Sequence, residues 1–308
     1  MTGSPLSPRT ITDIDGQVAK LLRGLGAPAP PLDLDSVREL LRLDRGYYST
    51  SNDSVLRETV SRLKVAGIQM LKRPTLLVDA VRQLSLKALY LPDQKRILLD
   101  EDLPKLKHRW NEAHEVGHDI IPWHQGMMLG DTEQTLTPAC HKQMEAEANH
   151  AAGRLLFLGD RFALEANSLP VSIASIRALS KTFANTVTST LWRFVEQSHP
   201  GLPMVALVSG HPHRDKRGPQ FDPAKPCKHF VPSSAFTHRF GSTSEVWLFA
   251  AVTSYCGRQR GGLLGEAEIV LGDVNGEDHV FHFETFFNSY EALTLGSYFR
   301  PAGHTVAI

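Results

Sequence analysis

The sequence predicts an α+β protein in which a mostly helical N-terminal part, interrupted by a small sheet, precedes a strand-rich C-terminal part. Three observations predict this class. Apolar residues recur at helical spacing through much of the first 197 residues, a short stretch near residue 90 has apolar segments on both sides of a polar turn, and strand-like segments become frequent after residue 200. A chain of 308 residues exceeds one average core, so we expect more than one domain.

The N-terminal segments are expected to be helices. A second helix is expected to begin at Asp35 as N-cap, after the loop GAPAPP at 26–31, and further helical patterns lie at 53–84 around Pro74. The first helix is predicted from apolar residues at helical spacing: Ile14, Val18, Leu21 and Leu22.

After these helices the spacing of apolar residues along the sequence changes. The stretch KALYLPDQKRILLD, 87–100, predicts a β-hairpin with a polar turn at 92–94. Two short helices joined at Ala184 and Asn185 are predicted at 172–183 and 186–197. Strands are predicted in the segments MVALV, EVWLFAAVTSY, EAEIVL and HVFHFE, the last two joined by a turn at Asn275 and Gly276.

Composition bears on the partners and the location of the protein, although it leaves local charged patches open. Lys plus Arg and Asp plus Glu number 33 each, so no bulk charge favours nucleic acid or an acidic membrane as partner. The three cysteines, Cys140, Cys227 and Cys256, are odd in number and form no CxxC, which predicts a reducing, cytoplasmic location. We expect neither a signal peptide nor a membrane span, because no apolar run approaches the roughly 18 residues that a span needs.

The stretch HEVGH, 114–118, carries the candidate chemistry. Helical spacing of four residues sets His114 and His118 about 40° apart, on the border of the apolar stripe of this helix, so both can reach one ion. Glu115 lies about 100° from His114, where it can hold a water bound to the same ion. Gly117 costs about 1 kcal/mol of helix propensity, which indicates a close approach to its backbone.

A catalytic zinc needs three protein ligands and an open position. The segment HKQMEAEANHAAGRLLF, 141–157, offers Glu145 and Glu147, which are about 200° apart on a helix. Glu145 lies at the edge of the apolar face near Asn149, whereas Glu147 falls on the predicted solvent side. The periodicity therefore predicts Glu145 as the third ligand and leaves Glu147 as a supporting or surface residue.

These residues resemble the ImmA/IrrE family of metallopeptidases, which are zincins of the gluzincin type. The family shows a hairpin, a helix of the form AHExGH and a helix of the form ExEANxFAxxLL; the corresponding text here includes NEAHEVGHDII and MEAEANHAAGRLLF, and the likeness covers about residues 30 to 160. The chain departs from the family at Ala151, where an aromatic residue is usual, and at Phe157 and Leu158, where Met-Pro is usual.

The resemblance implies a zinc metallopeptidase domain of zincin-like fold at 1–165, with His114, His118 and Glu145 as zinc ligands and Glu115 as general base. It implies hydrolysis of a peptide bond in a specific protein, a helix-turn-helix transcriptional repressor, in a stress or mobile-element response. Manganese or iron could occupy the same ligands. Candidates for the group that stabilises the oxyanion are His124, His141 and His150, among which the sequence does not choose.

The rest of the chain carries weaker signals. A helix-turn-helix-like segment at 166–199 can be read as a DNA reader with Arg177, Lys181 and Arg193, but a helical brace under the peptidase domain is favoured. The part at 200–308 is predicted to be an α+β or mostly β domain, GAF-like by analogy with relatives. A second metal site near HPHRD, 211–215, with Cys227, His229 and His238, fits no zinc template. The alternative function is a regulatory binding protein with an inactive or structural zinc site and a ligand-sensing C-terminal domain.

Overall fold

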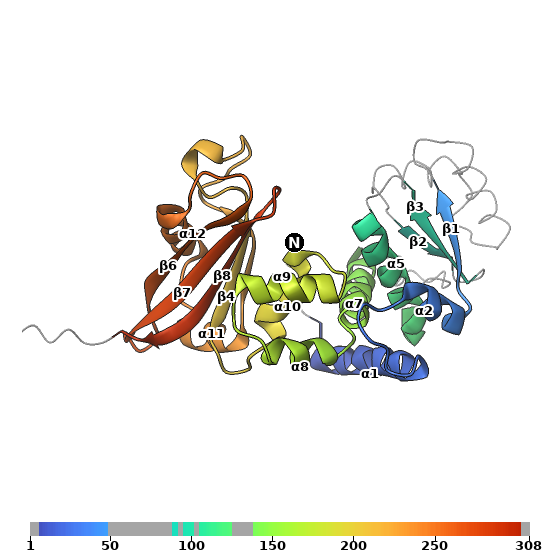
Figure 1. The fold of residues 1–308 in the computed structure, drawn as a ribbon. Helices are drawn as coiled ribbons and strands as arrows, with labels where there is room; N and C mark the ends of the chain where they lie inside the picture. The colour runs from blue at the N-terminus through green and yellow to red at the C-terminus, as the bar shows by residue number, and fades with distance from the viewer. Residues whose placement is uncertain (1–5, 49–87, 92–94, 102–104, 125–137, 303–308) are drawn as a thin grey trace, which may run out of the picture. The chain divides into compact units, whose positions relative to one another are not determined.

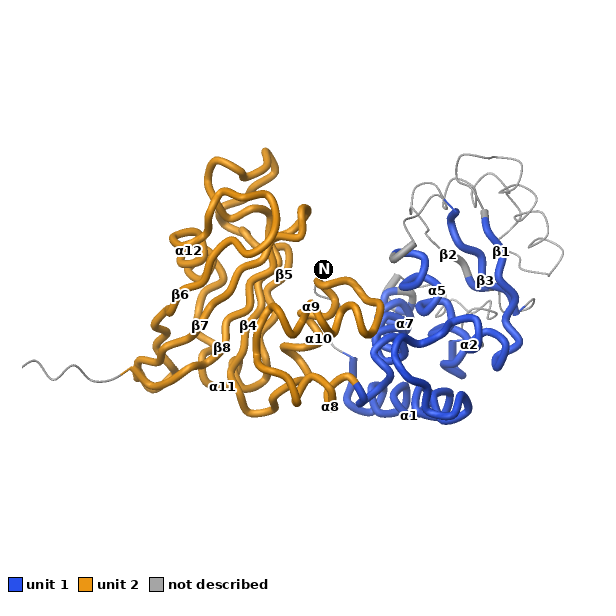
Figure 2. The backbone as a smooth tube through the Cα atoms, in the orientation of Figure 1, with its two compact units in different colours: residues 1–161 blue, residues 162–308 orange. Residues whose placement is uncertain are grey.

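The structure, a computed structural model, describes residues 6–48, 88–91, 95–101, 105–124 and 138–302. It combines helices with two sheets, which confirms the α+β prediction at this level (Figure 1). The chain divides into two compact units, residues 1–161 and 162–308 (Figure 2). The predicted helix-turn-helix-like segment, 166–199, lies within the second unit. The predicted helical patterns at 53–84 lie outside the described residues.

Two capped helices open the first unit. Helix α1, Pro8–Gly24, begins after Ser7, whose hydroxyl accepts the backbone N–H of Thr10, and it buries Ile14, Val18 and Leu21 as predicted. Helix α2, Leu34–Leu41, is capped by Asp33 rather than by the predicted Asp35. The prediction was wrong by two residues because the Asp33 carboxylate accepts the N–H groups of both Asp35 and Ser36.

A three-stranded sheet follows in the first unit. Its strand order is β1-β3-β2, with β3 parallel to β1 and antiparallel to β2. The strands of the predicted hairpin are thereby confirmed, while its turn at 92–94 lies outside the described part. The strand bounds are Asp44–Tyr48 for β1, Ala88–Leu91 for β2 and Arg96–Asp100 for β3.

Two long helices carry the predicted site, and the first of them covers this sheet. Helix α5, Lys105–Ile120, packs against β2, β3 and α7, and helix α7, Pro138–Leu156, also packs against α1 (Figure 1). Their shared core is apolar and fully enclosed. It includes Ala113, Val116, Ala148, Ala151 and Leu155, each 0% exposed.

The second unit begins with a helical pair that confirms the predicted one. Helix α9, Ile173–Thr182, and helix α10, Val187–Gln197, are joined by a turn in which Ala184 has φ +51°. They follow helix α8, Arg161–Asn167. Helix α10 packs against β4, β5 and β8, and α9 packs against β7. The pair therefore braces the sheet of its own unit.

That sheet has five antiparallel strands in the order β5-β4-β8-β7-β6. The predicted turn between β6 and β7 is confirmed at Gly276, which has φ +83°, a conformation that glycine adopts without steric cost. The strand bounds are Met204–Ser209 for β4, Cys227–Pro232 for β5, Gly262–Gly272 for β6, Asp278–Phe287 for β7 and Ala292–Pro301 for β8.

The predicted strand EVWLFAAVTSY was wrong, because it forms helix α12, Glu245–Tyr255. The segment is apolar nearly all round, and periodicity alone does not separate a buried helix from a buried strand. Together with helix α11, Ser234–Phe240, it covers one face of the sheet and forms the core with Phe281 and Phe283. The alternate residue Glu284 faces α9 on the other side of the sheet.

Two further expectations concern cysteines and membranes. All three cysteines lie in the described part of the chain, and none of them forms a disulfide. None of the helices in the described ranges is long and apolar enough to cross a bilayer.

Candidate metal centre

Helices α5 and α7 cross closely enough to bring the predicted ligands together. Gly117 lies at the crossing, where an added Cβ would stand 2.9 Å from the Ala148 carbonyl oxygen and 3.2 Å from the Ala151 Cβ. The glycine and the two small residues therefore permit the short distance between the helices. This explains the glycine inside HEVGH, which the sequence had indicated as a place of close backbone approach.

The three predicted ligands converge on one point. The Nε2 atoms of His114 and His118 are 3.2 Å apart, and Glu145 places one carboxylate oxygen 3.2 Å from His114 Nε2 and the other 3.5 Å from His118 Nε2. Ligand atoms at about 2.0–2.2 Å from one zinc ion are about 3.3–3.6 Å apart when tetrahedral. The observed separations are of this size, so the three side chains are close enough together to bind one ion.

The chemistry of the donor set also fits a cation. The Nδ1 atom of His114 faces the Asn149 side-chain oxygen at 3.1 Å and donates its proton there, so the neutral form of this ring has its lone pair at Nε2. The Nε2 atom faces the carboxylate of Glu145 and the ring of His118. The Glu145 side chain is 41% exposed, which leaves one side of the cluster open for a water or a substrate.

Charges within the cluster shift the pKa values of its side chains. Burial lowers the pKa of His114, but the hydrogen bond to Glu145 and the charges of Glu115 and Glu145 outweigh it and raise the pKa above its ordinary value. Burial acts to raise the pKa of Glu145, and the hydrogen bonds and charges of the two histidines hold it far below its ordinary value. Without a metal, a proton shared with His114 compensates the negative charge of Glu145.

Glu115 lies beside the ligands without being one of them. It is 6% exposed, and burial raises its pKa, against the opposing charges of His114 and His118. The backbone amide of Tyr90 in β2 hydrogen-bonds its carboxylate. A buried carboxylate with a raised pKa next to a metal site is well suited to accept a proton near neutral pH.

A buried hydrogen-bond chain lies behind His118. Its Nδ1 faces His124 Nδ1 at 3.0 Å, and His124 Nε2 faces a carboxylate oxygen of Glu147 at 2.8 Å. The indole of Trp123 and the amide of Gln143 also donate to Glu147, at 2.6 and 2.9 Å. These hydrogen-bonded side chains cover the side of His118 that faces away from the other two predicted ligands, and they fix the orientation of its ring.

The expectation that Glu147 lies on the solvent side of α7 was wrong, because Glu147 is 2% exposed. The helical wheel describes α7 alone, whereas the segment after α5 folds over this side of α7 and supplies Trp123 and His124. Sequence reasoning treated His124 only as an oxyanion candidate. The signal that it missed is a second histidine six residues after His118 combined with a second glutamate on the next helix.

The other oxyanion candidates fall elsewhere. His124 is fully buried and has both ring nitrogens engaged. His150 hydrogen-bonds Asp15 of α1 at 2.8 Å. The side chain of His141 lies outside the described residues. Neither described candidate faces the space beside Glu145.

The second unit contains two other groups of His and carboxylate side chains. Asp273, Glu277 and His279 meet at the end of β6, and Glu266, His282 and Glu284 meet on β6 and β7. The HPHRD loop does not join a convergent group of this kind among the described residues, and His211 instead contacts the Gln259 carbonyl oxygen at 3.0 Å.

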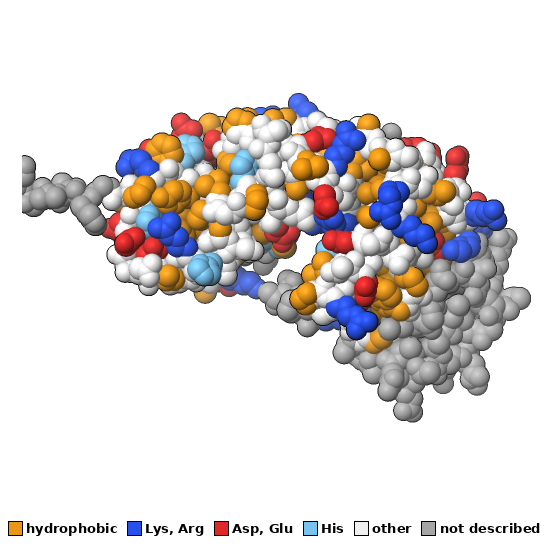
Figure 3. All heavy atoms as spheres, turned by 90° about the horizontal axis from the view of Figure 1, so that it is seen from below, with side chains coloured by type: hydrophobic (Ala, Val, Ile, Leu, Met, Phe, Trp, Pro, Cys, Tyr) orange, Lys and Arg blue, Asp and Glu red, His pale blue; other side chains and the backbone are white. Residues whose placement is uncertain are grey.

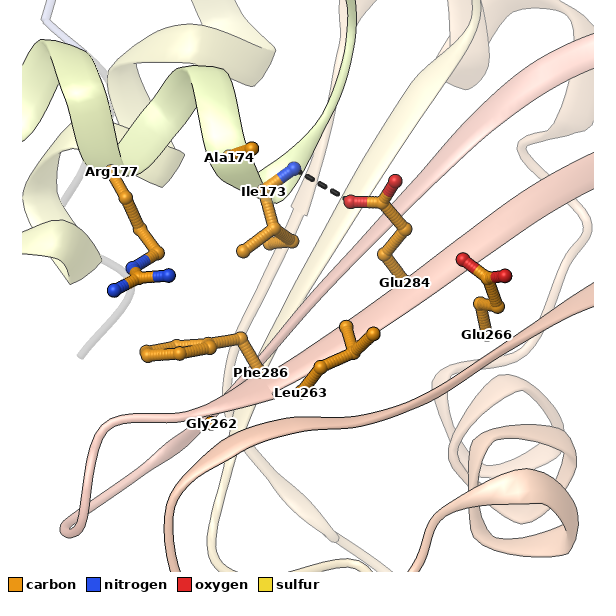
Figure 4. A pocket seen from close by; sticks show the side chains of 8 residues that line it. All are labelled: Ile173, Ala174, Arg177, Gly262, Leu263, Glu266, Glu284 and Phe286. Carbon is orange, nitrogen blue, oxygen red and sulfur yellow. Dashed lines mark hydrogen bonds between the residues drawn. The ribbon is translucent and has the colours of Figure 1, made fainter.

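A cavity of about 420 Å³ also lies in the second unit, between α9 and the strands β6 and β7 (Figure 4). Glu284 accepts the backbone N–H of Ile173 at 2.7 Å, and the Arg177 guanidinium lies 4.6 Å from the centre of the Phe286 ring. Its walls carry apolar groups, two carboxylates and one guanidinium, which is a lining that suits a small ligand.

The helical pair has few features of a DNA reader. Arg177 is engaged against Phe286, and α10 buries Leu191, Phe194 and Val195 in its unit. Figure 3 shows Lys, Arg, Asp, Glu and His side chains on one face of the molecule, and this view does not single out the helical pair. A DNA reader presents clustered positive charge. The contacts of α9 and α10 with the strands of their own unit support the interpretation of the pair as a brace within that unit.

Comparison with known proteins adds little. No protein-family model matches the chain, and no curated protein sequence does. Among solved structures, the chain is similar to a Mycobacterium tuberculosis transcriptional regulator, with 14% sequence identity and a TM-score of 0.49 over 93% of this chain and 88% of that chain. A similarity at this level carries no conclusion about function.

Proposed function

We propose that this protein is a zinc-dependent endopeptidase of the ImmA/IrrE type, with a zincin-like first unit. The observation that carries the proposal is the convergence of His114, His118 and Glu145 at short mutual distances with the buried Glu115 beside them. A purely structural zinc site is usually closed by four protein ligands, whereas in the described part of the chain three ligands converge here and Glu145 leaves one side exposed.

In the proposed reaction, three residues bind the metal and a fourth transfers the proton. His114, His118 and Glu145 would hold the ion, which when bound supplies a polarising Lewis acid and a water of lowered pKa. Glu115 accepts the proton of the attacking water at its carboxylate and then delivers it to the nitrogen of the leaving amine. Burial raises the pKa of this carboxyl, which makes its carboxylate a better proton acceptor.

The proposed substrate is a helix-turn-helix transcriptional repressor, and the proposed location is the cytoplasm. The substrate follows from the family resemblance of the HEVGH and MEAEAN segments, and the location follows from the three free cysteines, which fit a reducing compartment. A repressor encoded next to this protein is the first substrate to test.

The test compares the wild type with Glu115→Gln in zinc content and in cleavage of that repressor. We expect unchanged zinc content and a fall in cleavage of about 10²- to 10⁴-fold, the range of a general base. Glu39→Gln, an exposed carboxylate on α2, is the matched control and should cleave normally. Equal cleavage by the wild type and Glu115→Gln contradicts the assigned mechanism.

A regulatory binding protein remains the second candidate function. The cavity between α9 and the strands β6 and β7 favours it, because a volume of about 420 Å³ lies within the range of small-molecule sites. If the zinc-loaded wild type cleaves no candidate repressor but a small ligand shifts the unfolding midpoint of the wild type and not of Phe286→Ala, this function is supported instead.

A further inference from the structure

The hydrogen-bond chain behind His118 has a defined direction. His118 Nδ1 and His124 Nδ1 face each other at 3.0 Å, so one of them carries a proton and the other accepts it. At its other end, His124 presents Nε2 to Glu147 at 2.8 Å. A carboxylate only accepts, so Nε2 of His124 must carry its proton there.

The proton on His124 Nε2 determines where the protons of His118 lie. A neutral His124 that is protonated at Nε2 has a lone pair at Nδ1, so the proton between the two rings belongs to His118 Nδ1. A neutral His118 with its proton at Nδ1 has a lone pair at Nε2, and Nε2 is the atom that faces His114 and Glu145. The hydrogen bonds from Glu147 through His124 therefore hold His118 in the tautomer that a metal requires.

The carboxylate of Glu147, at the end of this series of hydrogen bonds, is itself held by further donors. Trp123 donates to the same oxygen as His124, and Gln143 donates to the other oxygen. Both Glu147 and His124 are almost completely buried, at 2% and 0% exposed. The backbone supports the same arrangement, because the N–H of His124 hydrogen-bonds the Ile121 carbonyl in the turn that ends α5.

We propose that His124 and Glu147 are positioning residues for the metal ligand His118. They hold its ring in one orientation and keep its proton on Nδ1, through a relay in which a second histidine stands between ligand and carboxylate. In many metal sites the ligating histidine donates directly to a carboxylate or carbonyl, and loss of that partner weakens metal binding. The inference rests on the metal site of the proposed function.

The first test measures zinc affinity by competition with a chromophoric chelator. His124→Leu removes both hydrogen bonds and is expected to weaken zinc binding by about 10- to 100-fold. His124→Gln can accept from His118 and donate to Glu147, so it should restore most of the affinity. His150→Gln is the matched control, because it alters a histidine on α7 that pairs with Asp15 and touches no ligand.

Unfolding of the metal-free variants separates positioning from folding. If His124→Leu is less stable but binds zinc as tightly as the wild type, the inference is overturned. Failure of the wild type to bind zinc would overturn the proposed function as well, whereas tight wild-type binding with no effect at His124 overturns the inference alone.

The second test reads the tautomers directly and serves if His124→Leu does not fold. In ¹⁵N-resolved NMR of the wild type loaded with zinc, His118 should be protonated at Nδ1 and His124 at Nε2. Protonation of His124 at Nδ1 would contradict the relay. The result does not depend on peptidase activity, so it also distinguishes this inference from the function assigned to Glu115.

Discussion

Two regions of this molecule contain similar side chains with different consequences. On α5 and α7, two histidines and Glu145 converge. At the end of β6, Asp273, Glu277 and His279 converge in the same way, but the Arg239 guanidinium lies 3.2 Å from Asp273 and 2.9 Å from His279. The backbone amides of Asn275 and Glu277 also donate to Asp273. The second group is already neutralised and organises a turn.

The group on β6 and β7 differs in another way. His282 is 3.5 Å from Glu284 and 4.0 Å from Glu266, whose side chain is 63% exposed. The shorter distance resembles those of the first group, but the longer distance and the exposure of Glu266 fit a surface ion pair better than a metal ligand. The comparison teaches that residue types alone do not define a metal site. What also matters is that the candidate ligands are not already neutralised by an arginine, lie at short mutual distances and adjoin a buried carboxylate that can act as a base.

The largest expected effect follows from removing a ligand. Glu145→Gln removes the negative charge and one ligand oxygen, and we expect zinc affinity to fall by more than about 100-fold, beyond the effect of a supporting residue. Glu284→Gln is the matched change in the second unit and should leave zinc affinity unchanged. Isothermal titration of both variants makes the comparison, and equal losses would contradict it.

The next effect concerns pH. Burial lowers the pKa of His124 to about 4, against the opposing hydrogen bond to Glu147. In the unfolded chain the pKa is about 6.5, so between these values the unfolded state binds more protons and the folded state loses stability as the pH falls.

From pH 7 to pH 5 this loss is on the order of 2 kcal/mol in the metal-free protein. Urea unfolding of the wild type and of His124→Gln at both pH values measures it. The Gln variant should show the smaller pH dependence, and a dependence equal to that of the wild type would place the titrating group elsewhere.

A smaller effect is expected at the helix crossing. Gly117→Ala brings a Cβ to 2.9 Å from the Ala148 carbonyl oxygen, so overpacking of about 1–3 kcal/mol outweighs the gain of about 1 kcal/mol in helix propensity. Gly16→Ala on α1 meets no atom within 4 Å and should stabilise the protein by about 1 kcal/mol. Thermal unfolding of both variants should show shifts of opposite sign.

The smallest effect is expected in the second unit. His282→Gln removes partly exposed ion pairs on the sheet, which are worth about 0–1 kcal/mol. Neither zinc affinity nor the unfolding midpoint should change by more than this. A marked fall in zinc content would show instead that this group binds metal.

Much of the fold could be predicted from sequence because it depends on local patterns. The Ala184 turn, the Gly276 turn and the periodicity of α1 each involve neighbouring residues. The errors arose where local signals are ambiguous. Helix α12 is apolar all round, and Asp33 and Asp35 are both chemically able to cap α2.

The sequence by itself determined which atoms are available for a metal: two histidines one helical turn apart, a glutamate beside them and Glu145 on the next amphipathic helix. Helical phase depends only on spacing, so this selection needed no tertiary information. Only the tertiary structure decided that Gly117 lets α7 approach, and that His124 and Glu147 are enclosed behind His118. Burial and hydrogen-bond direction depend on segments that fold over one another, and no periodicity within one helix contains that information.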